Sequence, residues 1–210
     1  SAVEEIDVTE KEVEDIVKKG NKSKLLLNSP SHGILQAYGQ KVALDRIEKW
    51  AREKNIITTN HLLELHNIIF VKIDPNAGRY REKFVKLKGS ALQPSFPFAL
   101  AADMRQFNDW LIKEQKVIDS EDVNQVILFI STLYHEITRI HPFADGNGRT
   151  GRLFVNLFLN RFGYPPILIP KVDNVKAMRE ALRKADMGDL SELVELNKQF
   201  LRKSYELRQS

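Results

Sequence analysis

Residues 140–152 read Ile-His-Pro-Phe-Ala-Asp-Gly-Asn-Gly-Arg-Thr-Gly-Arg, and they separate two long stretches whose apolar residues recur at helical spacing. Pro142 fixes its own φ and disfavours the helical conformation at His141, so the first helix should end near Ile140. Arg149 then opens a second helix, whose apolar face includes Leu153, Phe154, Leu157 and Phe158. The sequence therefore predicts a loop that leads directly into a helix N-terminus.

The glycines and arginines of this loop are suited to binding an anion. Gly146 and Gly148 permit positive φ and allow backbone N–H groups to turn toward one point. The first N–H groups of the new helix lack intrahelical acceptors, and the helix dipole adds positive partial charge there. Asn147 can either cap the helix or donate its side-chain amide to a phosphate oxygen. Arg149 and Arg152 lie three residues apart, so both can bind phosphate from one helix face.

Two further groups of the loop suggest a reaction. Asp145 is a hard oxygen ligand just before the anion site, and Mg²⁺ usually takes one or two carboxylates together with phosphate oxygens and waters. His141 has a reference pKa of about 6.5, so its neutral form dominates at pH 7 and can accept a proton. Phe143 is apolar and should anchor the loop to the core. Together these residues predict a metal-bound polyphosphate held beside a general base.

The same thirteen residues contain a motif with a known counterpart. From His141 to Arg152 they resemble the signature of Fic domains, H-x-F-x-[D/E]-G-N-G-R-x-x-R, with every fixed position present. The resemblance implies an enzyme, a protein adenylyltransferase that transfers AMP from ATP to a Ser, Thr or Tyr hydroxyl of a target protein and releases pyrophosphate, with Mg²⁺. By position, His141 would deprotonate that hydroxyl and Asp145 would hold the metal. The phosphates would be bound by Gly146, Asn147, Gly148, Arg149 and Arg152.

Residues 74–81 are similar to the segment that leads into the family's flap, a β-hairpin that clamps an extended stretch of target by strand addition. The predicted hairpin covers residues 80–88. The flap residues expected to contact the target are Tyr80, Phe84, Val85, Lys86 and Leu87. The partner implied is a target protein, which could be this chain itself through auto-AMPylation.

Outside the hairpin, the spacing predicts an all-α chain. Thr9 and Glu12 form a capping box at the start of one helix. Further helices are expected over residues 98–113, 122–140, 174–187 and 190–207. We expect a Fic catalytic domain over residues 51–210, preceded by an N-terminal helical extension over residues 1–50.

The adenine end of the nucleotide and the control of the enzyme are predicted from weaker patterns. Met178, Leu182 and Asp186 recur at i, i+4 and i+8 and could form one wall of an adenine site, although a core stripe explains the first two equally well. This leaves the nucleotide preference open. His32, His61, His66 and His135 are interpreted as structural or surface residues. His135 and Glu136 do not form the zinc-peptidase motif, because Arg139 stands where that motif needs its second histidine.

Many Fic proteins carry an inhibitory helix with the pattern [S/T]-x-x-x-E-[G/N]. The nearest match begins at Ser23 and ends at Asn28, with Leu27 in place of the glutamate. A leucine cannot pair with Arg152, so this frame predicts a chain that is constitutively active or restrained by an inhibitory partner. The alternative is that the three leucines, residues 25–27, simply pack against the core.

The composition of the chain excludes several classes of protein. The chain has 210 residues, a net charge of +4 and no cysteine, so neither a disulfide framework nor a thiol nucleophile is available. Its basic residues are not interleaved with aromatic residues as in a nucleic-acid platform. No apolar run reaches membrane-spanning length, and a cytoplasmic location is expected.

Other reactions of the same site stay open at this stage. They are removal of AMP from a protein, and transfer of a different nucleotide or phosphate group. A third class is a nucleotide-binding toxin-type module controlled by a partner. The intact His141 argues against pure binding, because binding alone needs no base.

Overall fold

A computed structural model describes residues 8–27, 30–86, 93–167 and 172–209. Within these ranges the regular structure is entirely helical, which confirms the predicted all-α fold. The α-helices are α1 (Glu10–Lys19), α2 (His32–Arg52), α3 (Thr59–Phe70), α4 (Leu100–Glu114), α5 (Val123–Ile140), α6 (Asn147–Arg161), α7 (Val172–Ala185) and α8 (Ser191–Gln209). Two short 3₁₀ turns, Gly20–Lys22 and Lys24–Leu26, join α1 to the segment before α2.

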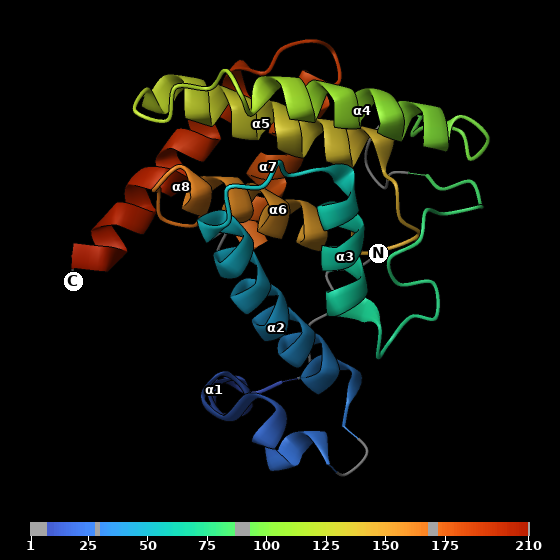
Figure 1. The fold of residues 1–210 in the computed structure, drawn as a ribbon, viewed down its shortest axis with the longest axis vertical. Helices are drawn as coiled ribbons and strands as arrows, with labels where there is room; N and C mark the ends of the chain where they lie inside the picture. The colour runs from blue at the N-terminus through green and yellow to red at the C-terminus, as the bar shows by residue number, and fades with distance from the viewer. Residues whose placement is uncertain (1–7, 28–29, 87–92, 168–171, 210) are drawn as a thin grey trace.

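Helix α6 occupies the middle of the fold, where it packs against α2, α3 and α5. Most of the buried residues of α6 and its preceding loop are apolar, and Phe143, Phe154 and Phe158 are fully buried. Figure 1 shows α4 and α5 running side by side along one side of the molecule, with the last turns of α8 extending away from the body. The loop that begins at His141 is therefore fixed at both ends by core helices.

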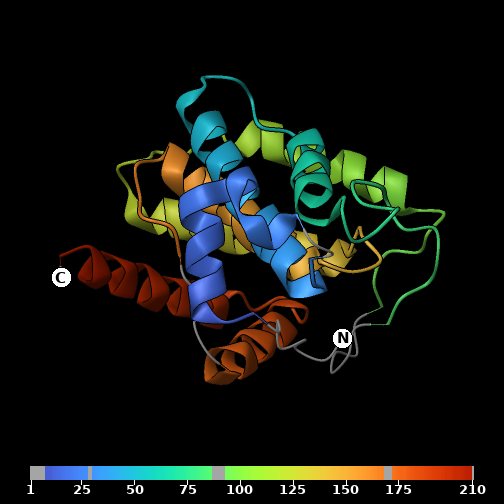
Figure 2. The same ribbon diagram turned by 90° about the horizontal axis from the view of Figure 1, so that it is seen from below.

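The N-terminal part of the chain packs onto the same body through α2. Figure 2 shows α1 lying across α2, and Thr9 caps α1 in the predicted capping box with Glu12. Gly39 of α2 touches the backbone of α3, because a Cβ built on it would lie 2.5 Å from the carbonyl oxygen of Ile69. Only glycine allows this close approach, which sets the position of α2 against α3.

The predicted flap is not seen as a hairpin. Residues 80–86 have no strand assignment, and residues 87–92, including Leu87, lie outside the described residues. Among the described helices, none has both the length and the apolar character needed to cross a bilayer.

Candidate active site

His141 ends helix α5 in the left-handed conformation, with φ 56° and ψ 60°. It is the one non-glycine residue of the described ranges with positive φ. Helix α5 stops at Ile140 as predicted, but His141 adopts the left-handed region rather than the extended one that a following proline usually favours. Such a conformation costs free energy and persists only where neighbouring contacts hold it.

Arg81 provides those contacts. Its guanidinium is buried and donates from Nε to the carbonyl of His141 over 2.7 Å and from Nη2 to the carbonyl of Ile140 over 3.4 Å. Its backbone N–H donates to the carbonyl of Pro142 over 2.9 Å. Further bonds from Nη1 and Nη2 reach the carbonyls of Lys83 and Ser95. The acceptors are all carbonyls, and burial lowers the pKa of Arg81.

This role of Arg81 is not predicted by its sequence context. Arg81 stands at the end of a turn-rich segment, and no local sequence pattern indicates that it donates to the carbonyl of His141, 60 positions away.

The His141 ring is oriented by α5 itself. Its Nδ1 lies 3.2 Å from the carbonyl oxygen of Thr138, and a carbonyl only accepts, so Nδ1 carries the proton and Nε2 keeps the lone pair. Burial lowers the pKa of His141, the bond to Thr138 acts in the opposite direction, and the charge of Arg81 lowers it further. The ring is therefore a neutral base at pH 7, with Nε2 as the accepting atom.

The two loop glycines serve different purposes. Gly146 has φ 78°, as predicted, and a Cβ there would lie 2.4 Å from the ring of Phe70. Gly148 lies inside α6 and does not use the positive φ that a glycine permits. A Cβ on Gly148 would instead lie 3.3 Å from Nη1 of Arg152 and 3.8 Å from the hydroxyl of Tyr134. Gly148 thus leaves room for the side chain of Arg152.

The side chain of Asn147 has neither of its two expected roles, which were to cap the helix and to donate to a phosphate oxygen. Its side chain is buried, accepts from the N–H of Phe143 over 2.9 Å and donates to the carbonyl of Phe143 over 2.8 Å. It therefore neither caps α6 nor offers its side-chain amide to a phosphate. The backbone remains suited to an anion, because the first helical bond of α6 is from Thr150 to Gly146 and the N–H groups of residues 147 and 148 come before it.

His66 joins three segments around the loop. Its Nδ1 accepts from the N–H of Gly78 over 2.8 Å, so Nε2 carries the proton and donates to the carbonyl of Asp145 over 3.1 Å. The ring stacks on Phe143 at 3.8 Å, and burial lowers its pKa. The interpretation of His66 as a structural residue fits these contacts, and they fix the backbone of Asp145.

Asp145 and Arg149 form the charged part of the loop. The carboxylate of Asp145 is 60% exposed and lies 3.2 Å from Nη2 of Arg149. The guanidinium of Arg149 also lies over the ring of Phe70, at 4.6 Å, and donates to Gln36 over 2.6 Å. One exposed carboxylate beside a helix N-terminus fits a Mg²⁺ ion whose other ligands are phosphate oxygens and waters.

Of the residues predicted for the adenine side, Met178 lies near Arg152 of the loop. Met178 is buried and lines a cavity of about 10 Å³ together with Arg152 and Tyr134. That volume holds about one water molecule. Leu182 is half-buried and packs against the hydrophobic core. Their assignment to an adenine site stays a prediction.

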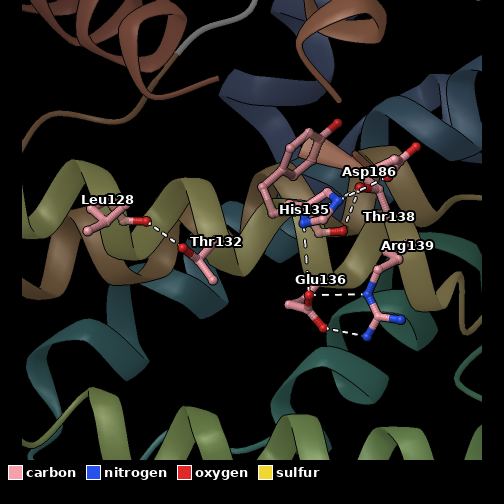
Figure 3. A network of polar contacts seen from close by, with 8 residues as sticks. Leu128, Thr132, His135, Glu136, Thr138, Arg139 and Asp186 are labelled. Atoms are coloured by element: carbon pink, nitrogen blue, oxygen red, sulfur yellow. Dashed lines mark hydrogen bonds and ion pairs between the residues drawn. The ribbon is translucent and has the colours of Figure 1, made fainter. Parts of the chain in front are cut away.

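Asp186 belongs to a polar network on α5 instead. Its carboxylate lies 3.0 Å from Nε2 of His135, and Glu136 forms a two-pronged ion pair with Arg139 (Figure 3). Thr138, whose carbonyl holds His141, also takes part, because its hydroxyl donates to the carbonyl of His135 over 2.9 Å (Figure 3). The network fastens the end of α7 to the helix that carries the candidate base.

The predicted regulatory position lies on the surface. The side chain of Leu27 is 71% exposed, so the alternative that the three leucines pack against the core is wrong for Leu27, whereas Leu25 and Leu26 are half-buried. Ser23 is buried, and its hydroxyl donates to Asp15 over 2.6 Å and accepts from the N–H of Leu25. The segment forms a 3₁₀ turn, Lys24–Leu26, rather than an α-helix, and Asn28 lies outside the described residues.

The described flap residues vary in exposure. Tyr80 and Val85 are half-buried, whereas Lys86 is exposed and Phe84 is 67% exposed. Phe84 meets Phe96 edge to face at 5.8 Å. Burial raises the pKa of Tyr80.

Comparison with known proteins supports the family resemblance predicted from the loop. Residues 56–159 match the model of the Fic/DOC family. A protein adenylyltransferase Fic from Drosophila willistoni is 36% identical over 157 residues, which are 74% of this chain and 30% of that relative. The chain thus spans under a third of the length of the curated relatives it matches.

Two solved structures share the fold. One is a crystal structure of a Fic-domain-containing signalling protein from Bacteroides thetaiotaomicron, with 25% identity, a TM-score of 0.72 and coverage of 94% of this chain and 86% of that one. The other is Fic-1 from C. elegans, with 23% identity, a TM-score of 0.70 and coverage of 99% of this chain and 58% of that one.

Proposed function

The chain belongs to the Fic/DOC family, and on that basis we propose that it is a protein adenylyltransferase, which moves AMP from ATP to a Ser, Thr or Tyr hydroxyl of a target protein. The observation that carries the proposal is the neutral His141 ring, with Nδ1 bound to Thr138 and Nε2 left as the base, at the start of the loop that ends in α6. A binding module would need the loop but not an oriented base.

In the proposed step, Nε2 of His141 accepts the proton of the target hydroxyl while the hydroxyl oxygen bonds to the α-phosphorus of ATP. The bond between the α-phosphorus and its bridging oxygen to the β-phosphate breaks, and pyrophosphate leaves with those electrons. The products are AMP-modified protein, pyrophosphate and one proton on the imidazole. Orientation of the two reactants and electrostatic stabilisation supply most of the rate enhancement.

The phosphates would lie against the N-terminus of α6. Its first backbone N–H groups, at residues 147 and 148, face an anion there, and Arg149 and Arg152 add full positive charges. Asp145 would hold Mg²⁺, which supplies charge neutralisation for the pyrophosphate leaving group. Arg152 can extend toward this region because Gly148 has no side chain.

The target would approach from the flap side. Arg81 ties residues 80–83 to the carbonyl of His141, so a target segment paired with the flap would be held at a fixed distance from the base. The catalytic domain would cover residues 51–210, with residues 1–50 as an extension. With Leu27 in the glutamate position, the enzyme would be constitutively active or restrained by a separate inhibitory partner.

The test is incubation of the chain with ATP labelled at the α-phosphate, Mg²⁺ and cell lysate. Labelled protein bands should form with the native chain and should fall by at least about a hundredfold with His141→Ala, the typical contribution of a general base. A matched control is His32→Ala, an exposed histidine at the start of α2.

The same assay separates the alternatives. Loss of label from protein modified beforehand would identify the reverse reaction. Labelling from the γ-phosphate but not the α-phosphate would identify phosphate transfer. Label that persists at the native rate in His141→Ala would overturn the assignment of the base.

A further inference from the structure

Gln36 reaches the active-site loop from a part of the chain that the family match does not include. It lies in the second turn of α2, 113 residues before Arg149, whereas the matched residues begin at 56. Its side chain is 5% exposed, and its Oε1 accepts from Nη1 of Arg149 over 2.6 Å. A partly buried, charge-assisted bond of this length is among the stronger contacts of the loop.

Three elements meet at the guanidinium of Arg149. Gln36 approaches from α2, the ring of Phe70 lies beneath it from α3 at 4.6 Å, and the carboxylate of Asp145 approaches from the loop at 3.2 Å. The contact between Gly39 and the backbone of Ile69 sets α2 against α3, so Gln36 and Phe70 have a fixed relative position. The guanidinium is thus oriented before any ligand binds.

The kind of acceptor at position 36 matters. A carboxamide oxygen orients a guanidinium by a hydrogen bond but carries no net charge, so it leaves the positive charge of Arg149 available to an anion. A carboxylate in the same place would orient the group equally well and would also neutralise it. The carboxylate of Asp145 lies within ion-pair distance of Arg149, and in the proposed function it would bind Mg²⁺.

We propose that Gln36 is a positioning residue of the phosphate site, which holds Arg149 toward the nucleotide phosphates without cancelling its charge. This inference rests on the proposed function, and it makes α2 a part of the active site rather than only an extension. The chemical class recognised through this arrangement is a nucleoside polyphosphate.

The experiment measures the affinity of the full chain for Mg²⁺–ATP by calorimetry, in a His141→Ala background that prevents turnover. Gln36→Leu removes the acceptor at similar size and should weaken binding about tenfold, the usual effect of losing a bond to a charged group. Gln36→Glu keeps an acceptor but adds a charge, and it should also weaken binding while its Tm stays at or above that of the parent. Gln40→Leu, one turn further along α2 and half-buried, is the matched control and should bind as the parent does.

A purely structural role of Gln36 gives a different pattern. Gln36→Glu would then bind Mg²⁺–ATP as tightly as the parent, and this result would overturn the inference. A second test is a double-mutant cycle, in which Gln36→Leu should change affinity by less than about twofold once Arg149→Met is present. An undiminished effect of Gln36→Leu in that background would also overturn it.

The two proposals fail in distinguishable ways. If Mg²⁺–ATP binds and responds to Gln36 as described, but the native chain transfers no AMP, only the proposed function is wrong. If the native chain transfers AMP but affinity is insensitive to Gln36, only the inference is wrong. If no nucleotide binds at all, both are wrong.

Discussion

Nε of Arg81 donates to the carbonyl oxygen of His141 over 2.7 Å, and this bond joins the flap side of the molecule to the residue that ends α5 in a left-handed conformation. The same guanidinium also bonds to the carbonyls of Ile140, Lys83 and Ser95. Arg81 therefore determines both the backbone at the candidate base and the start of the predicted target-binding segment.

Replacing Arg81 should harm the enzyme in two ways. Arg81→Met leaves several carbonyls without donors and should lower the free energy of unfolding by about 2–4 kcal/mol. It should also lower kcat at least about tenfold at temperatures where the protein stays folded, because His141 loses the bond that holds its backbone. Denaturant unfolding and AMP transfer measure the two effects. Arg79→Met, at an exposed position two residues earlier, is the control, and equal effects of both variants would contradict this role of Arg81.

The pH dependence of transfer should reflect a base with a lowered pKa. Burial, the largest cause, disfavours the charged ring of His141, so the ring stays neutral further into acid than a free histidine. Activity should therefore be retained on lowering pH from 8 to 7 and should fall only below the ordinary histidine value of about 6.5. The dependence of kcat/KM on pH, measured with enough Mg²⁺ to keep ATP complexed, gives the midpoint of this fall in activity, the acid limb of the profile. A midpoint above that value would contradict the described surroundings of the ring.

Removing the charge of Arg81 tests its contribution to the lowered pKa of His141. Because that charge lowers the pKa of His141, the acid limb of Arg81→Met should move toward higher pH. An acid limb that moved toward lower pH would contradict the role assigned to the charge.

Gly146 should tolerate alanine worse than a glycine with similar dihedrals elsewhere. Gly163 has φ 83° and open space where a Cβ would lie, so Gly163→Ala meets backbone strain alone and should cost about 1–2 kcal/mol. Gly146→Ala meets the same strain and also places its methyl group against Phe70, which should add about 1–3 kcal/mol. Chemical denaturation of both variants gives the difference. Equal losses would show that Phe70 moves aside without cost.

Leu27→Glu tests the inhibitory frame. Since Leu27 is 71% exposed, a glutamate can be accommodated there with little change in Tm. If position 27 comes to face Arg152, auto-AMPylation should fall sharply, because the new carboxylate would compete with phosphate for the guanidinium. Val17→Glu, at an exposed position of α1, is the control for added charge. Unchanged activity of Leu27→Glu would reject the frame.

The sequence was most informative where the chemistry is local. The end of α5 at Ile140, the glycine at position 146 and the capping box of Thr9 depend on residues within one turn, so their patterns could be recognised directly. The all-α fold followed from apolar spacing for the same reason. The contents of the loop were predicted from its residues and from the resemblance that they carry.

The errors have a common origin in contacts that spacing does not encode. Asn147 turns back onto Phe143, because its buried amide finds both partners in the backbone of that residue. Gln36 and Arg81 act on the loop from distant parts of the chain. Such residues look ordinary in a sequence, since their importance depends on tertiary packing and not on any neighbour along the chain.

The side chain of Asn147 uses its carbonyl and its amide to close a small ring with Phe143, entirely within the protein. The loop therefore has this shape before any nucleotide binds. Nucleotide arrival should cost little conformational entropy there, and the amide of Phe143 should resist solvent exchange even when the enzyme is empty.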